Sequence, residues 1–163
     1  MHYAIITKIL TLVLKVELCF LAIPTGLALY YGESVRPFII TAIFIVASTA
    51  VLSQFKPKSN IIRLKEGFAA TALTWIVLSV FGCLPFYFSG YFGGFVNAFF
   101  EAVSGFTTTG ASILTEIESL PKSILFWRSF THWLGGMGII IFVLAFMPNI
   151  DSSSVNLLRA ESP

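Results

Sequence analysis

Charged side chains are scarce in this sequence, and their scarcity argues against a water-soluble fold. Asp, Glu, Lys and Arg together make up 11% of the residues, whereas 56% are hydrophobic. Soluble domains usually contain about 25% charged residues. The net charge of +2 is small and there is no basic run, so nucleic acid is not expected as a partner.

The residue types that build disulfide frameworks and metal centres are also scarce. The two cysteines, Cys19 and Cys83, each lie in an apolar stretch, where a thiol packs as a small hydrophobic group. Two histidines without clustered cysteine or acidic partners do not make a transition-metal site, so His132 and Met137 are expected to pack. The sequence contains neither a nucleophile elbow nor a phosphate-binding loop. It therefore predicts no enzyme and no cofactor.

Long apolar runs are what the sequence has instead. A helix needs about 20 mainly apolar residues to cross the hydrocarbon core of a bilayer. Runs of roughly this length occur at about 9–31, 37–55, 67–88 and 123–147. The first run is too long for the core of a signal peptide and no A-x-A site follows it, so we expect it to be retained as a helix.

A further apolar stretch is too short to cross the membrane. Residues 95–106 would form a helix of only about 18 Å, and glycines flank it at 93–94 and at Gly105. This length is typical of a re-entrant segment that enters the membrane and returns on the same side. A helix lying at the membrane surface is the alternative. The residues that follow favour a re-entrant pore helix at about 95–104.

The segment after this short helix, Thr107, Thr108, Thr109 and Gly110, is poor in helix-forming residues at what should be membrane depth. Non-helical backbone is tolerated there only when it is buried in protein or lines a water-filled path. Its carbonyl oxygens could replace the water shell of a cation, with Gly110 supplying dihedral freedom and the helix C-terminus a negative dipole end. We therefore predict an ion-binding filter at 107–111, with an ordinary polar turn as the alternative.

Basic residues in the connections predict the orientation. The connection between the second and third runs contains Lys56, Lys58, Arg63 and Lys65. The connection at 89–121 contains only acidic charges, namely Glu101, Glu116 and Glu118. Because cytoplasmic loops are enriched in Lys and Arg, the first connection and both chain ends are expected in the cytoplasm, and the re-entrant segment enters from outside.

Charges inside the apolar runs should be paired or functional. Glu101 and Arg128 should lie at the same depth, so we expect them to meet and, with Gly105, to support the filter. The alternative is that each faces external water. Lys15 and Glu17 are expected to reach the cytoplasmic interface or to pair with a neighbouring helix, rather than to serve an ion path.

The segments GFTTTGA at 105–111, FWRS at 126–129 and WLGGMG at 133–138 together resemble the TrkH branch of the Trk/Ktr/HKT potassium transporters. The resemblance covers essentially the whole chain, and Gly110 matches the key filter glycine of one repeat. It implies potassium as the transported ion in a bacterial inner membrane, and a TrkA-type cytosolic nucleotide-binding gating partner. The family has four pore repeats in one polypeptide and this sequence contains one. It therefore looks like the N-terminal part of a longer protein.

The predicted fold class is an all-α integral membrane protein in three parts. Residues 1–60 form an N-terminal transmembrane helix pair and a cytoplasmic loop, 61–150 form the pore-loop repeat, and 151–163 form a cytoplasmic connector. Glycines within 135–138 serve either close helix packing or a bend beside the pore. The expected partners are the lipid bilayer and further pore repeats or like subunits.

Two alternatives to potassium translocation are open. The chain could be a non-conducting assembly or regulatory subunit that retains the fold of one pore repeat. It could also be a secondary transporter with a broken helix, but this class predicts an inverted repeat and none is visible.

Overall fold

The computed structural model describes the backbone of residues 3–54 and 64–146, and side chains over 6–54 and 67–138. Within these ranges the regular structure is entirely helical, which confirms the all-α fold class there. The helices are α1 (Tyr3–Tyr30), α2 (Arg36–Leu52), α3 (Leu64–Gly82), α4 (Leu84–Ser89), α5 (Phe95–Phe106) and α6 (Lys122–Phe146). The basic residues at 56–63, which were predicted to lie in a cytoplasmic connection, are outside the described residues. The connector predicted at 151–163 is also outside them.

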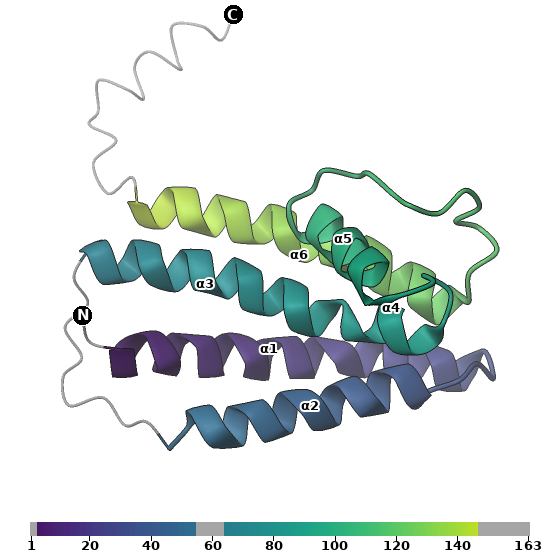
Figure 1. Ribbon diagram of the computed structural model, residues 1–163, viewed down its shortest axis with the longest axis horizontal. Helices are drawn as coiled ribbons and strands as arrows, with labels where there is room; N and C mark the ends of the chain where they lie inside the picture. Colours follow the sequence, from purple (N-terminus) through teal and green to yellow (C-terminus); the bar gives the residue numbers. More distant parts are fainter. Residues whose placement is uncertain (1–2, 55–63, 147–163) are drawn as a thin grey trace, which may run out of the picture.

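The four longer helices lie lengthwise in one bundle (Figure 1). Helix α1 packs against α2, α3 and α6, and the short α5 packs against α3, α4 and α6. The start of α1, the end of α2, the start of α3 and the end of α6 lie at one end of the bundle. Helix α5 and the loop after it lie toward the opposite end. The short helix and the loop therefore lie in the half of the bundle away from the chain's described ends.

The buried residues of α1 form one stripe along its length. From Thr11 onward they recur at three- and four-residue intervals, which places them on one helix face, and they are Thr11, Leu14, Glu17, Leu21, Pro24 and Ala28. Four of these six side chains are apolar, as expected for a packed helix face. Glu17 is the acidic member of this buried stripe.

The apolar run predicted as one span at about 67–88 is divided in the structure. Helix α3 ends at Gly82 and α4 begins at Leu84, with Pro85 in its first turn. Proline lacks a backbone N–H and its ring clashes with the carbonyl four residues earlier, so a continuous helix is interrupted here. Among the described residues, the stretch Gly67–Ser89 is long and apolar enough to cross a membrane, whereas α2 and α5 are apolar but shorter.

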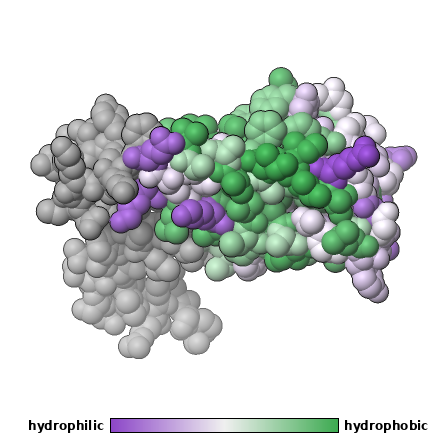
Figure 2. All heavy atoms as spheres, turned by 90° about the horizontal axis from the view of Figure 1, so that it is seen from below, coloured by the Kyte–Doolittle hydropathy of each residue, from purple (hydrophilic) through white to green (hydrophobic). Residues whose placement is uncertain are grey.

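The outer surface of the bundle is apolar over its middle. Figure 2 shows a broad hydrophobic area on one face, with hydrophilic residues toward the ends of the described part. Large side chains exposed on the long helices include Leu12, Ile43, Phe44, Val51 and Ile76. Contiguous apolar surface of this kind suits lipid and not water.

Candidate ion-conduction site

Helix α5 ends where the predicted filter begins. It starts after Gly94 and continues to Phe106, two residues beyond the pore helix expected at 95–104. The buried residues on one face of α5 include Ala98, Glu101, Ala102, Ser104 and Gly105. On the other face Phe95, Val96 and Phe100 are exposed. The C-terminal end of the helix, with its partial negative charge, therefore adjoins Thr107 directly.

Two glycines, one on each helix, allow α5 and α6 to approach each other closely just before the predicted filter segment. A Cβ on Gly135 would overlap the backbone carbonyl of Phe106, and one on Gly105 would overlap the side chain of Thr131. Helix α6 runs without interruption from Lys122 to Phe146, so the glycines at 135–138 do not produce a break. The close contacts of Gly135 with Phe106 and of Gly138 with Trp75 bear out the packing interpretation of this cluster, and a bend at these glycines stays a prediction.

The predicted filter segment leaves the helix in a tight turn. The backbone N–H of Thr108 donates to the Gly105 carbonyl, and that of Thr109 to the Ser104 carbonyl, both at 2.9 Å. Thr108 and Gly110 adopt left-handed φ angles of 56° and 77°. A β-branched residue in this region is strained, so the surrounding contacts must hold Thr108 in place.

The carbonyl groups of this segment differ in whether they are already bonded. The Ala111 carbonyl accepts a hydrogen bond of 2.5 Å from the Ser104 hydroxyl. In the described part of the chain, no hydrogen bond uses the carbonyls of residues 107–110, and these residues are exposed. Four successive residues at the end of α5 therefore present unbonded acceptors, which are the ligands that a desolvated cation needs.

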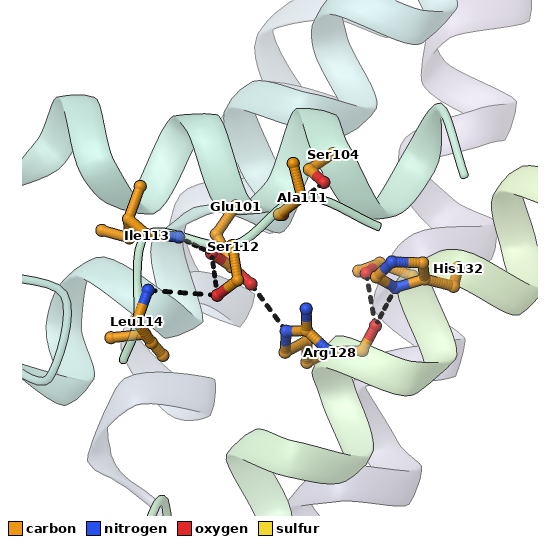
Figure 3. Close-up of polar contacts among 9 residues, drawn as sticks. Glu101, Ser104, Ala111, Ser112, Ile113, Leu114, Arg128 and His132 are labelled. Atoms are coloured by element: carbon orange, nitrogen blue, oxygen red, sulfur yellow. Dashed lines mark hydrogen bonds and ion pairs between the residues drawn. The ribbon is translucent and has the colours of Figure 1, made fainter. Parts of the chain in front are cut away.

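A buried carboxylate holds the chain just after this segment (Figure 3). Glu101 is 1% exposed, and its Oε1 lies 2.6 Å from Nε of Arg128. Its Oε2 accepts hydrogen bonds from the Ser112 hydroxyl at 3.1 Å and from the Ile113 N–H at 3.2 Å. The predicted meeting of Glu101 and Arg128 is confirmed, and the alternative of separate exposure to water is wrong. Glu101 thus connects α5, α6 and the segment at 112–113.

Comparison with known proteins identifies the family. A family model described as TrkH, cation transport protein, matches residues 34–163. The chain belongs to this TrkH family. Its members are integral membrane transporters and not enzymes, so the TrkH resemblance and the predicted membrane class are confirmed.

Three TrkH relatives illustrate the similarity. The Trk system potassium uptake protein TrkH of Escherichia coli K12 is 38% identical over 167 residues, covering 100% of this chain and 34% of that protein. TrkG of the same strain is 33% identical over 143 residues, covering 86% and 30%. An uncharacterised cation transporter of Methanocaldococcus jannaschii is 39% identical over 124 residues, covering 75% and 26%. The chain therefore spans about a third of the length of the curated TrkH proteins it matches.

One contact between distant segments of this TrkH-family chain was not predicted from its sequence. The carboxylate of Glu33, in the α1–α2 turn, accepts the backbone N–H groups of Lys122 and Ser123 at 2.7 and 2.9 Å, and the Ser123 hydroxyl at 2.5 Å. Partial burial raises the pKa of Glu33, but the Ser123 and Lys122 hydrogen bonds and the Lys122 charge outweigh it, so the pKa is lowered. Glu33 caps α6 from a distant turn.

At the same end of α6, on the predicted external side, the side chain of Lys122 lies against an aromatic ring. The Lys122 ammonium lies 4.5 Å from the centre of the Tyr31 ring, in a cation–π arrangement.

Further along α6, His132 Nδ1 lies 2.9 Å from the Arg128 carbonyl of its own helix. Met137, which was expected to pack and not to bind a metal, is 43% exposed in this chain.

The expectation for Glu17 is wrong. Its side chain is 1% exposed, so it does not reach an interface, and within the described part of the chain neither carboxyl oxygen has a hydrogen-bond partner on a neighbouring helix. Lys15, two residues earlier, is exposed. The position of Glu17 in the three- and four-residue stripe of α1 indicated an inward direction, but hydropathy alone did not show which groups would surround it.

Proposed function

We propose that this chain supplies one pore-loop unit of a potassium-conducting path, with the carbonyl groups of Thr107, Thr108, Thr109 and Gly110 as its ion ligands. The observation that carries this proposal is the row of unbonded carbonyls directly after the C-terminus of α5. Relatives named Trk system potassium uptake protein support potassium as the ion. Potassium is then the transported ion, and no cofactor takes part.

The physical role of the surrounding residues follows from what a filter needs. A cation leaves water only if oxygen ligands replace its hydration shell at little cost in reorganisation. The Ser104 hydroxyl fixes the carbonyl of Ala111, and Glu101 fixes Ser112 and Ile113. These contacts turn the end of the segment away from the ion, so that the carbonyls of 107–110 keep their positions when the ion leaves.

One pore loop contacts an ion from one side only. A filter of carbonyl groups needs a ring of oxygen ligands around the ion. In this proposal, further pore units complete that ring. They belong either to the same polypeptide or to like subunits. The division of the chain into a helix pair at 1–60, a pore repeat at 61–150 and a connector at 151–163 is part of the same proposal.

In this proposal the chain crosses a bacterial inner membrane several times with both ends in the cytoplasm. The α5 end of the bundle then faces outside, where ions enter the filter. A cytosolic nucleotide-binding subunit of the TrkA type would act from the opposite end, as the resemblance to the family implies. Binding of such a subunit to the purified protein, tested with and without nucleotide, examines this part independently of ion flux.

Uptake in living cells tests the proposal. The complete gene is expressed in bacteria that lack their own potassium uptake systems, and rubidium or potassium entry is measured at low external potassium. Restored uptake is expected. A protein that inserts into the membrane but restores no uptake, while binding other membrane subunits, would instead identify a non-conducting assembly subunit.

The isolated 163-residue chain provides a second arm. Reconstituted alone in lipid vesicles, it should insert without passing potassium, because the ring of ligands is incomplete. Stable tetramers of this chain that conduct potassium would show that like subunits complete the ring.

A further inference from the structure

Glu17 is a buried acid that the proposed conduction path does not use. It lies near the middle of α1, and its neighbours in the stripe, Leu14 and Leu21, are apolar. Neither Oε1 nor Oε2 has a hydrogen-bond partner among the residues that the structure describes. An ionised carboxylate in this state is far more costly than a neutral carboxylic acid, since burial without partners penalises charge most strongly.

The carboxyl group of Glu17 lies against the back of the pore unit. The position that a Cβ on Gly82 would occupy is 3.3 Å from Glu17 Oε1 and 2.5 Å from a ring carbon of Phe106. The carbonyl of Gly82 is already taken by the indole N–H of Trp127 at 2.9 Å. Glu17, Gly82 and Phe106 therefore meet at one point, and Phe106 directly precedes the filter.

No described ionisable group on the surrounding helices compensates a charge on Glu17. The Cys83 thiol, at the end of α3, is within electrostatic range but is neutral or negative in either form. On α6, Arg128 is paired with Glu101, and the other described ionisable groups are Lys122 and His132. The described side chains of α3 over 67–82 include no ionisable residue, α2 has Arg36 at its exposed outer end, and on α1 Lys8, Lys15 and Cys19 are exposed.

We propose that Glu17 is a proton-binding site that is occupied at neutral pH, and that its ionisation loosens the contact between α1 and the base of the filter. A single carboxyl group suits a proton and not a metal ion, and the described residues include no group of three possible metal ligands. When the proton leaves, the carboxylate must gain water or move away from Gly82. Either change disturbs the packing of Phe106, and potassium uptake falls at alkaline pH.

Infrared difference spectroscopy tests the bound proton directly and does not depend on transport. The complete protein is purified as wild type, as Glu17→Gln and as the exposed-site control Glu118→Gln. At neutral pH we expect a carboxylic-acid carbonyl band that is present in wild type and in Glu118→Gln but lost in Glu17→Gln. If Glu17→Gln fails to accumulate, isotopic labelling of glutamate should shift the same band in the wild-type protein. No band assigned to Glu17 by either route would overturn the site.

Uptake measured against pH tests the coupling and rests on the proposed function. Wild-type uptake should fall several-fold from neutral to alkaline pH, and Glu17→Gln should lose most of that fall because its side chain cannot ionise. Equal pH profiles for the two proteins would overturn the coupling while leaving the proton site to the infrared result. A protein without uptake at any pH would contradict the proposed function, and the infrared band would still decide whether Glu17 holds a proton.

Discussion

Arg128 Nε and Glu101 Oε1 lie 2.6 Å apart, with the Glu101 side chain fully buried and Arg128 16% exposed. The other oxygen of Glu101, Oε2, accepts hydrogen bonds from the Ser112 hydroxyl and the Ile113 N–H. A buried ion pair is stabilising only when its geometry and additional hydrogen bonds offset desolvation. Here they connect α5, α6 and the segment at 112–113.

Removing one charge of this pair should destabilise the protein more than removing both. Arg128→Gln leaves Glu101 buried without a cation, and breaking a buried pair in this way costs about 3–5 kcal/mol. The double variant Glu101→Gln, Arg128→Gln should recover part of the loss. Thermal unfolding of both single variants and the double variant in detergent measures the coupling, with Glu118→Gln as an exposed control. Effects that add within about 0.5 kcal/mol would show that the two residues act independently.

Two neighbouring glycines on α6 provide a matched test of the close approach to α5. Gly135→Ala forces a methyl group into the Phe106 carbonyl, which can move only with the backbone. We expect a loss of about 1–3 kcal/mol and impaired uptake. Gly136→Ala meets only the Thr108 methyl group, at 4.0 Å, and should be close to wild type. Similar melting temperatures for the two variants would contradict the packing described for Gly135.

Glu33 should contribute stability with a defined pH dependence. Its pKa in the folded protein is below the unfolded value of 4.5. The contribution is therefore complete above the unfolded pKa and disappears as pH falls through the lower folded pKa. Glu33→Gln should reduce stability by about 1 kcal/mol at neutral pH, as for loss of a helix cap, and by little in acid. Unfolding followed across this range checks it, with the exposed Glu116→Gln as control. A difference from wild type that persists unchanged in acid would exclude an ionised cap.

Several features of the site could be predicted because they depend on local sequence or on depth in the membrane. The length of the apolar run at 95–106 indicated a short helix, and the depth of Glu101 and Arg128 indicated that they would meet. The hydrogen bonds that Ser112 and Ile113 donate to Glu101 could not be predicted, since they depend on how the loop returns along α5.

Other features depend on contacts between distant segments. Glu33 reaches Lys122 across 89 residues of sequence, and no periodicity signals such a cap. The isolation of Glu17 depends on which groups of α3 and α6 surround it. A hydropathy average locates a charge in depth but does not identify its neighbours. The helix is interrupted at Cys83 because of Pro85. A count of apolar residues over this run does not show the effect of a single proline.

Potassium uptake by a Gly110 variant tests the central claim most directly. Gly110 and Gly32 both have left-handed φ angles, 77° and 68°, and at each of them the position that a Cβ would occupy has no atom within 4 Å beyond the adjoining residues. Gly110→Val and Gly32→Val therefore impose similar backbone strain in open space, the first in the filter and the second in the α1–α2 turn. Uptake and potassium selectivity should be lost in Gly110→Val and retained in Gly32→Val, with comparable amounts of both proteins in the membrane. Unaltered potassium uptake and selectivity in Gly110→Val would contradict the assignment of residues 107–110 as the filter.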